Sequence, residues 1–308
     1  MTGRRQSFAP PDTVARRPSM HRSPAVWRIQ GTDHRLGGRT WIMGILNVTP
    51  DSFSDGGRYL DPVRAVERLR VMAEEGADLV DVGGESTRPG SDPVPPDEQW
   101  RRIGPVLELA RRSGPSCLLS VDTTDGEVAR RALDLGVSVV NDVSCLEADP
   151  RLASLAARTG AGLVLMHRQG DPKTMQTEPR YDDLLGEVRD GLAKGIAAAA
   201  AAGVNREQIV VDPGIGFGKL LEHNLDLLLH AGALEPLGRP VLVGASRKSF
   251  LKLLLDLPVA ERLEGSLAAH VAAVLGGAHI VRTHDVLATR RAVGVADALL
   301  HRLSEGVS

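Results

Sequence analysis

An alternation of short apolar runs with helix-like stretches fills the chain after residue 40, and it limits the possible folds more than any other feature. Eight apolar runs recur, namely WIMGIL, ADLVDVG, SCLLSVD, VSVVND, AGLVLMH, QIVVDPG, RPVLVGAS and AHIVRTHD. Most of them are rich in Val, Ile and Leu and lack the period-2 alternation of a half-exposed strand. Because strands that are buried on both faces have this character, the runs predict a parallel sheet.

Helical patterns lie between these runs. Residues 64–77 carry apolar side chains at helical spacing, residues 125–137 and 149–161 begin with Asp and end near Gly, and residues 184–204 are rich in Ala. A strand followed by a helix, about eight times in about 265 residues, predicts a single-domain (β/α)8 TIM barrel in the α/β class. A doubly wound sheet ranks second, because such sheets usually have fewer strands.

The N-terminal part departs from this rhythm. Residues 27–42 predict a β-hairpin with a Gly-Gly turn, which would close the bottom of the barrel. Residues 1–26 are rich in Arg, Pro and Ser, and we expect a disordered extension there. An organelle-targeting segment is the alternative, although the prolines disfavour the amphipathic helix that it needs. No linker divides the rest, so we expect residues 27–308 to form one domain.

Composition argues against several classes of function. The net charge of −2 provides no basic field for nucleic acid, and no apolar run approaches the roughly 18 residues of a membrane-spanning helix. The two cysteines, Cys117 and Cys145, lack the CxxC spacing of a zinc site and make no disulfide framework. We therefore expect a reduced, cytoplasmic protein without a nucleic-acid or membrane partner.

Nearly every apolar run ends in polar residues. In a (β/α)8 barrel the carboxyl ends of all strands open onto one face, where active sites form. We therefore expect one pocket to collect the polar residues that follow the strands: Asn47, Glu85, Thr87, Arg88, Asp122, Asn141, Asp142, His167, Asp212, Lys248, Arg282 and His284.

Several of these residues also allow simpler interpretations. Asp122 could cap the next helix, Asn141 could belong to a turn, and His167 could be structural. Lys248 could be the Schiff-base nucleophile of an aldolase barrel, or a cation that hydrogen-bonds a ligand. Arg282 and His284 alternate along the last strand, so their side chains point the same way and suit an anion.

Two loop segments have an unusual composition. The segment DPGIGFGK (212–219) resembles two phosphate-binding motifs but fits neither, because Lys219 interrupts GxGxxG, and Pro213 and Leu220 interrupt the P-loop pattern. A Gly-rich turn that lets a flat ligand approach the backbone is the better interpretation. The segment NVTPDSFSDGG (47–57) holds more small polar residues than a turn needs; a plain long loop or a glycosylation acceptor at 47–49 would also fit.

Taken together, the motifs resemble the dihydropteroate synthase family of the folate pathway. The matching segments occur in family order over roughly residues 41–286: IMGILNVTPDSFSDGG, DVGGESTRPG, SVDT, NDVS, LMHRQGDPKTMQ, DPGIGFGK, GASRKSF and VRTHDV. The resemblance implies a homodimeric barrel and a transferase reaction with Mg²⁺. In that reaction 4-aminobenzoate displaces diphosphate from (7,8-dihydropterin-6-yl)methyl diphosphate to give 7,8-dihydropteroate, and sulfonamides compete with 4-aminobenzoate.

The resemblance also implies roles for individual residues. The pterin would be bound by Asp122, Asn141, Met166, Asp212, Phe217, Gly244 and Lys248. A carboxylate such as Asp212 suits the N–H donors of the pterin edge. Catalysis would rest on Asp122, Lys248, Arg282 and His284.

The other two substrate groups are placed in the same way. The diphosphate would be held by Asn47, Thr87, Arg88, Arg282 and His284, with Mg²⁺ near Asn47. The 4-aminobenzoate would lie against Phe53, Thr87, Arg88, Pro89 and Ser249. The NVTPDSFSDGG and STRPG segments would then be loops that close over the substrates, which accounts for their small polar residues.

Some positions depart from the family pattern, and other functions stay open. Cys145 follows NDVS where a Gly or another small residue is expected, and Arg168 and Leu220 are unusual near the pocket. A barrel that transfers a methyl group from methyltetrahydrofolate would share the pterin edge but would need neither STRPG nor the Arg282–His284 pair. A catalytically inactive pterin-binding paralogue is the non-enzymatic alternative.

Overall fold

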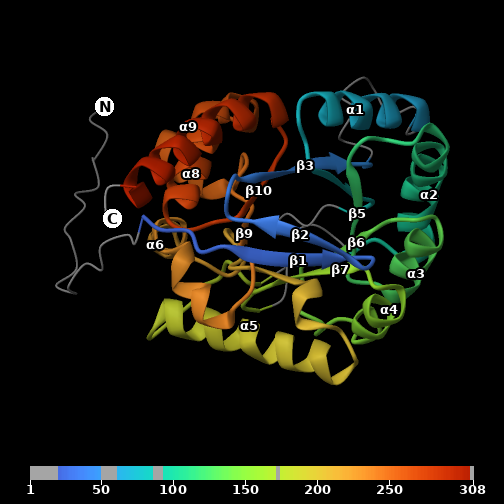
Figure 1. Ribbon diagram of the computed structural model, residues 1–308, viewed down its shortest axis with the longest axis horizontal. Coiled ribbons are helices and arrows are strands. Elements are labelled where there is room, and N and C mark those ends of the chain that lie inside the picture. Colours follow the sequence, from blue (N-terminus) through green and yellow to red (C-terminus); the bar gives the residue numbers. More distant parts are fainter. Residues whose placement is uncertain (1–19, 50–60, 86–92, 171–173, 306–308) are drawn as a thin grey trace.

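Eight parallel strands form a nearly closed barrel in the computed structural model, which describes residues 20–49, 61–85, 93–170 and 174–305 (Figure 1). The strands are β3 (Trp41–Asn47), β4 (Leu79–Gly83), β5 (Leu118–Asp122), β6 (Val139–Asp142), β7 (Gly162–Met166), β8 (Ile209–Asp212), β9 (Leu242–Val243) and β10 (Ile280–Thr283). They are hydrogen-bonded in the order β8-β7-β6-β5-β4-β3-β10-β9, and a parallel bridge from Val211 to Val241 joins the two ends. The predicted (β/α)8 barrel is confirmed.

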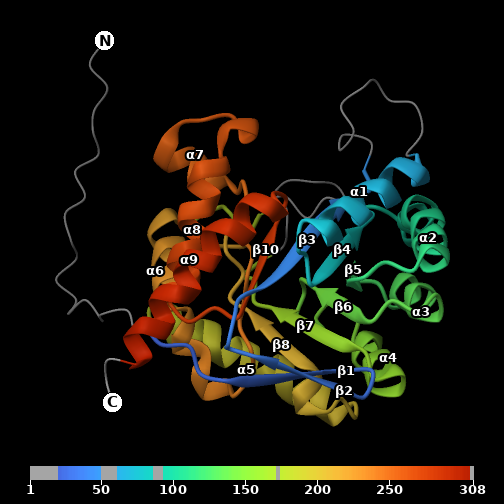
Figure 2. The ribbon, with the colours of Figure 1, turned by 45° about the horizontal axis from the view of Figure 1, so that its top comes forward.

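Helices surround the strands on the outside (Figures 1 and 2). They are α1 (Pro62–Glu74), α2 (Pro96–Ser113), α3 (Gly126–Asp134), α4 (Arg151–Thr159), α5 (Leu184–Ala201), α6 (Leu221–Leu229), α7 (Ser249–Leu255), α8 (Leu263–Leu275) and α9 (Val286–Glu305), with short 3₁₀ turns η1 (Arg206–Gln208), η2 (Ala231–Leu237) and η3 (Val259–Glu261). Asp125 caps α3 by accepting hydrogen bonds from two backbone N–H groups, so the alternative that Asp122 is this cap is wrong. Within the described residues, none of the helices has the length and apolar character needed to cross a membrane.

A two-stranded hairpin closes the bottom of the barrel, as predicted. Its strands are β1 (Ala25–Ile29) and β2 (Thr32–Leu36). Trp27 is fully buried in a core of its own with residues from the barrel strands, namely Trp41, Met43, Leu79, Val139, Val164, Val210, Leu242 and Ile280. The apolar side chains at the amino ends of the strands therefore pack against the hairpin, and the opposite face of the barrel is left for function.

The position of the hairpin turn and the N-terminal boundary of the domain differ from expectation. The turn is Gln30–Gly31, with φ of +49° and +80°, whereas Gly37 and Gly38 link β2 to β3. A two-residue turn with positive φ at both positions matches the twist of the paired strands, so the shorter loop is preferred. The predicted boundary at residue 26 is too late, because Arg22 already forms a buried ion pair with Asp297 (2.9 Å).

We expect Trp27→Phe to lower the free energy of unfolding by about 1–3 kcal/mol, because the substitution leaves a buried acceptor without its donor. The indole Nε1–H of Trp27 donates to the carbonyl of Gln208 (2.8 Å). Urea denaturation followed by circular dichroism would measure the loss. Trp100→Phe on α2 is the control, since its indole donates no hydrogen bond to a described residue; equal losses in both variants would contradict the prediction.

Candidate active site

A cavity of about 580 Å³ opens at the carboxyl ends of the barrel strands. Its walls come from β3, β10, the Gly-rich turn after β8, and the segment from Gly244 to η3 that contains α7. Figure 2 shows α7 projecting on the side of the barrel opposite to the β1–β2 hairpin. Seven of the predicted site residues line this cavity together: Asn47, Phe217, Gly244, Lys248, Ser249, Arg282 and His284.

A network of buried charged and polar side chains links β10, β4, β5 and β6 beneath the cavity. The guanidinium of Arg282 donates from Nε to Asp81 Oδ2 and from Nη2 to Asp122 Oδ2, both at 2.8 Å. Asn141 Nδ2 donates to the same oxygen of Asp81 at 2.8 Å, so Asn141 belongs to strand β6 and not to a turn. The sequence analysis missed Asp81. A charged residue in the middle of the apolar run ADLVDVG was the signal for it.

Asp122 contributes a buried and unpaired oxygen to this network. Burial raises the pKa of the Asp122 carboxyl, while the neighbouring Arg282 cation opposes that rise. Its Oδ1 atom is buried and has no hydrogen-bond partner among the described residues. Since buried acceptors in proteins are nearly always paired, this oxygen is suited to receive an N–H donor from a ligand.

Asp212 lies at the end of β8, beside two lysines. Its Oδ1 accepts a hydrogen bond from the backbone N–H of Gly214 (2.7 Å), and burial raises the pKa of the carboxyl while Lys248 opposes the rise. The ammonium of Lys248 lies 4.7 Å from the centre of the Phe217 ring and donates to the carbonyl of Ile215. Burial lowers the pKa of Lys248 to about 8.

Apolar side chains and a glycine complete the wall. Met166 and Phe217 are buried in one small cluster with Met175, which the sequence analysis missed. Gly244 faces the two cations, because a Cβ placed there would lie 3.7 Å from Lys248 Nζ and 3.6 Å from Arg282 Cβ. Any side chain at position 244 would therefore take up space in front of these cations.

The remaining residues implied by the resemblance divide into two groups. His284 is held at the cavity by Ser246, whose hydroxyl lies 2.9 Å from His284 Nδ1, and Ser249 is at the exposed start of α7. Phe53, Thr87, Arg88 and Pro89 lie outside the described residues, as do most of the two segments predicted to close over the substrates.

Lys219, a further residue that the sequence analysis did not assign to the site, supports the Gly-rich turn. Its side chain is buried, and Nζ donates to the carbonyl of Phe217 (3.0 Å) and lies 3.1 Å from His167 Nδ1. Because an ammonium only donates, Nδ1 of His167 is the acceptor. Burial lowers the pKa of His167 to about 3, so the ring is neutral. We therefore interpret His167 as a residue that supports the Gly-rich turn through Lys219.

Lys219 is expected to make stability depend on pH. Burial lowers its pKa from 10.5 to about 7, so between these values the unfolded chain holds a proton that the folded chain does not. Stability should therefore rise with pH over this interval, by at most about 1.4 kcal/mol per pH unit. Urea denaturation at several pH values should show this slope in the wild type and a shallower slope in Lys219→Met. The exposed Lys194→Met should keep the wild-type slope, and parallel curves for all three proteins would contradict the prediction.

The backbone conformation at Cys145 explains why the family pattern has a glycine or another small residue at this position. The residue has φ of +55°, in the left-handed region where glycine is favoured, which explains why a small residue is expected after NDVS. Its sulfur packs against Gly195 of α5, where a side chain would collide with it. Burial raises the pKa of the thiol to about 12, so Cys145 is a packing residue.

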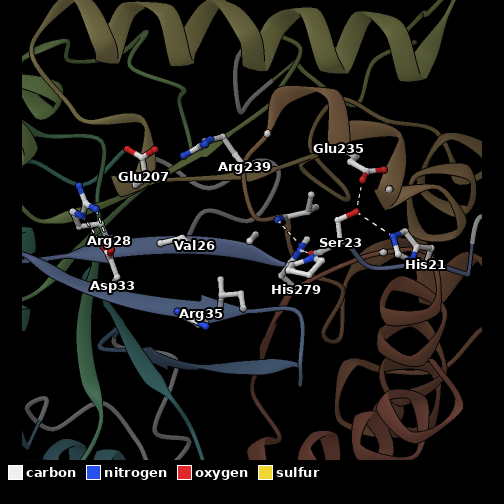
Figure 3. A pocket seen from close by; sticks show the side chains of 17 residues that line it. His21, Ser23, Val26, Arg28, Asp33, Arg35, Glu207, Glu235, Arg239 and His279 are labelled. Atoms are coloured by element: carbon white, nitrogen blue, oxygen red, sulfur yellow. Dashed lines mark hydrogen bonds and ion pairs between the residues drawn. The ribbon is translucent and has the colours of Figure 1, made fainter. Parts of the chain in front are cut away.

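A second cavity, of about 890 Å³, lies beside the hairpin at the opposite end of the barrel (Figure 3). Two of its charged side chains pair with each other, Arg28 with Asp33 (2.6 Å), and Glu235 accepts a hydrogen bond from Ser23. None of the predicted site residues lines it. The carboxyl face of the barrel is therefore the candidate active site.

The chain is similar to known proteins over most of its length. Residues 43–284 match the family described as "Pterin binding enzyme". The chain is 46% identical over 260 residues to a dihydropteroate synthase of Escherichia coli, covering 84% of this chain and 91% of that one, and 46% identical over 264 residues to one of Synechocystis, covering 85% and 91%.

Solved structures show the same likeness. The dihydropteroate synthase of Xanthomonas albilineans with 4-aminobenzoic acid superposes with a TM-score of 0.82 at 42% identity, over 89% of this chain and 98% of that one. The Burkholderia cenocepacia enzyme complexed with 7,8-dihydropteroate superposes with a TM-score of 0.81 at 40% identity, over 92% and 99%. A Yersinia pestis dihydropteroate synthase structure contains a sulfonamide drug.

Proposed function

The chain belongs to the pterin binding enzymes, among the dihydropteroate synthases, and from this premise we propose that it is a transferase that condenses (7,8-dihydropterin-6-yl)methyl diphosphate with 4-aminobenzoate. The products are 7,8-dihydropteroate and diphosphate. One observation carries the proposal: buried hydrogen-bond acceptors lie next to a cavity that is lined by cations. The buried Asp122 and Asp212 lie next to the lining cations Arg282 and Lys248, and Asn141 joins the same network through Asp81. Five Lys or Arg side chains line the cavity without a single described carboxylate.

The inner end of the site is complementary to the edge of a pterin ring. The pyrimidinone ring presents N–H donors in a plane, which suit the unpaired Oδ1 of Asp122 and the carboxylate of Asp212. Met166 and Phe217 contribute flat apolar surface, and Lys248 can donate to a ring acceptor. Gly244 leaves the room that the ligand needs beside the two cations.

The diphosphate would lie among Asn47, Arg282 and His284. Arg282 uses Nε and Nη2 on the two aspartates, and its Nη1 makes no hydrogen bond to a described residue, so this group can donate to a phosphate oxygen. Among the described residues no cluster of three or more His, Cys, Asp or Glu could hold a metal by itself. The amide oxygen of Asn47 fits a Mg²⁺ ion that takes its other ligands from the diphosphate and water. When bound, Mg²⁺ would neutralise charge on the leaving group.

The displacement requires a weak arylamine nucleophile to form a C–N bond at the exocyclic carbon of the pterin. The C–O bond to the diphosphate breaks, the diphosphate leaves with the electron pair, and the amine nitrogen loses a proton. Because the dihydropterin is electron-rich, we infer that bond breaking runs ahead of bond making. With its unpaired Oδ1 facing the pterin edge, Asp122 would stabilise positive charge on the ring.

We also propose a homodimer in the cytoplasm. Large apolar side chains are exposed on α6, α7 and α9, three helices that each contact α8: Leu229, Leu253, Leu254, Leu255, Leu287, Val295, Leu299 and Leu303. Such an apolar surface suits a second copy of the chain. Both cysteines are free, as expected in a reducing compartment. Sedimentation of the purified protein would measure its mass in solution.

The test is turnover by the purified protein. The dihydropterin diphosphate and Mg²⁺ would be supplied with and without 4-aminobenzoate, and both dihydropteroate and diphosphate would be followed. We expect both products only when 4-aminobenzoate is present, and a strong loss of rate when a chelator removes Mg²⁺. Pterin binding without product would instead identify the inactive paralogue, and methyl transfer from methyltetrahydrofolate would identify the other barrel enzyme.

A further inference from the structure

More cations line the cavity than the buried network around Arg282 accounts for. The five cations that line it are Arg247, Lys248, Lys252, Arg262 and Arg282, and His284 lies beside them. A cavity of this kind attracts anions along its whole length and not only at the diphosphate. The two substrates carry negative charge at different places, because the pterin substrate has its diphosphate and the arylamine has its carboxylate.

Four of the five cations already have partners. Arg282 pairs with Asp81 and Asp122, and Arg247 pairs with Asp285 at 2.6 Å. The buried Arg262 donates to the carbonyls of Leu257, Arg247 and Lys248, while the ammonium of Lys248 donates to Ile215. Lys252 is different, since its ammonium makes no hydrogen bond or ion pair with any residue in the described part of the chain.

Exposure along the cavity shows where Lys252 lies. The lining residues Ile45 and Phe217 are 7% and 9% exposed, whereas Leu253 on α7 and Val259 on η3 are 69% and 43% exposed. Lys252 is itself exposed and lies three residues after Ser249, so both share one face of α7. The cavity therefore runs from a buried interior to a mouth formed by α7 and η3, with Lys252 at that mouth.

The reaction sets the direction of the arylamine in this cavity. Its nitrogen must reach the exocyclic carbon of the pterin, which would lie in the interior. Its carboxylate is attached at the opposite end of a rigid ring and must therefore point to the mouth. Leu253 and Val259 provide apolar surface there, and Lys252 is the uncommitted cation among the described lining residues.

We propose that Lys252 determines the specificity of the arylamine subsite by binding the carboxylate of the incoming arylamine, so that the enzyme selects anionic over neutral arylamines. This inference rests on the proposed function. The contact is at a solvent-exposed mouth, so its effect is modest and depends on salt. It acts on one substrate only, because the pterin diphosphate lies deeper in the site.

The experiment compares kcat/KM for 4-aminobenzoate with kcat/KM for the neutral 4-aminobenzamide, at saturating dihydropterin diphosphate. In Lys252→Gln we expect the ratio of acid to amide to fall about three- to ten-fold at low ionic strength, with the value for the amide nearly unchanged. Lys252→Glu should lower the ratio further by adding repulsion. Lys194→Gln, an exposed lysine on α5 away from this cavity, should keep the wild-type ratio.

The ratio separates specificity from folding, since a structural defect would lower both values of kcat/KM together. A ratio equal to that of the wild type in both Lys252 variants would overturn the inference while leaving the synthase activity in place. A wild-type protein that forms no product from either arylamine would overturn the proposed function, and this inference with it.

Discussion

Arg282→Ala is expected to lower the free energy of unfolding by about 3–5 kcal/mol, because it leaves two buried carboxylates facing each other without their shared cation. Asp81 is fully buried and Asp122 is 4% exposed, and both accept hydrogen bonds from Arg282. Burial already raises the pKa of Asp122, and loss of the cation would raise it further. Asp122 can then relieve the repulsion by taking up a proton, so the deficit relative to the wild type should shrink as the pH falls.

Chemical denaturation at mildly acidic and at alkaline pH would measure both the deficit and its pH dependence. Arg247→Ala is a matched control. The ion pair of Arg247 with Asp285 is shorter than those of Arg282, but the two side chains are 30% and 21% exposed. We expect that control to cost less than about 1 kcal/mol. The double variant Arg282→Ala/Asp81→Asn should recover part of the loss by removing one buried charge. A deficit that is equal at all pH values would show that lost packing, and not unpaired charge, is the cause.

Asp212→Asn is expected to weaken pterin binding by about 1–3 kcal/mol, which is roughly a five- to 150-fold rise in Kd. The asparagine can still accept the hydrogen bond from Gly214 N–H through its amide oxygen. Its amide nitrogen, however, presents donors where the carboxylate presented an acceptor, and the pterin edge also consists of donors. The fold should therefore persist while the ligand loses a charged hydrogen-bond partner.

Calorimetric titration with a pterin that lacks the diphosphate would isolate this contribution. Asp285→Asn is the control, since that carboxylate pairs with Arg247 and does not face the predicted pterin edge. An unchanged Kd in Asp212→Asn would remove Asp212 from pterin recognition. A comparable loss in Asp285→Asn would mean that general charge near the cavity, and not a direct contact, governs binding.

The barrel and most of the described site residues follow from local sequence patterns. Short apolar runs without alternation favour strands that are covered on both faces, and eight of them separated by helices leave few arrangements other than a barrel. The polar residues after each run then had to meet at one face. This is why Asn47, Lys248, Arg282 and His284 line one cavity. Phe217, Gly244 and Ser249 line it too, but they were expected only from the family resemblance.

Other features depended on contacts between distant parts of the chain. Arg282 and Asp81 are 201 residues apart in sequence, and neither shows from its neighbours that the two share a buried ion pair. Lys219 is one of five lysines in the chain, and its burial against His167 is visible only in the structure. The hairpin turn is at Gln30–Gly31 because the strands must be registered to place Trp27 in the barrel. Periodicity and composition act over a few residues and so determine elements and their ends. The partner of each charged side chain, and whether that side chain is buried or left unpaired, depend on how the closed barrel brings those strand ends together.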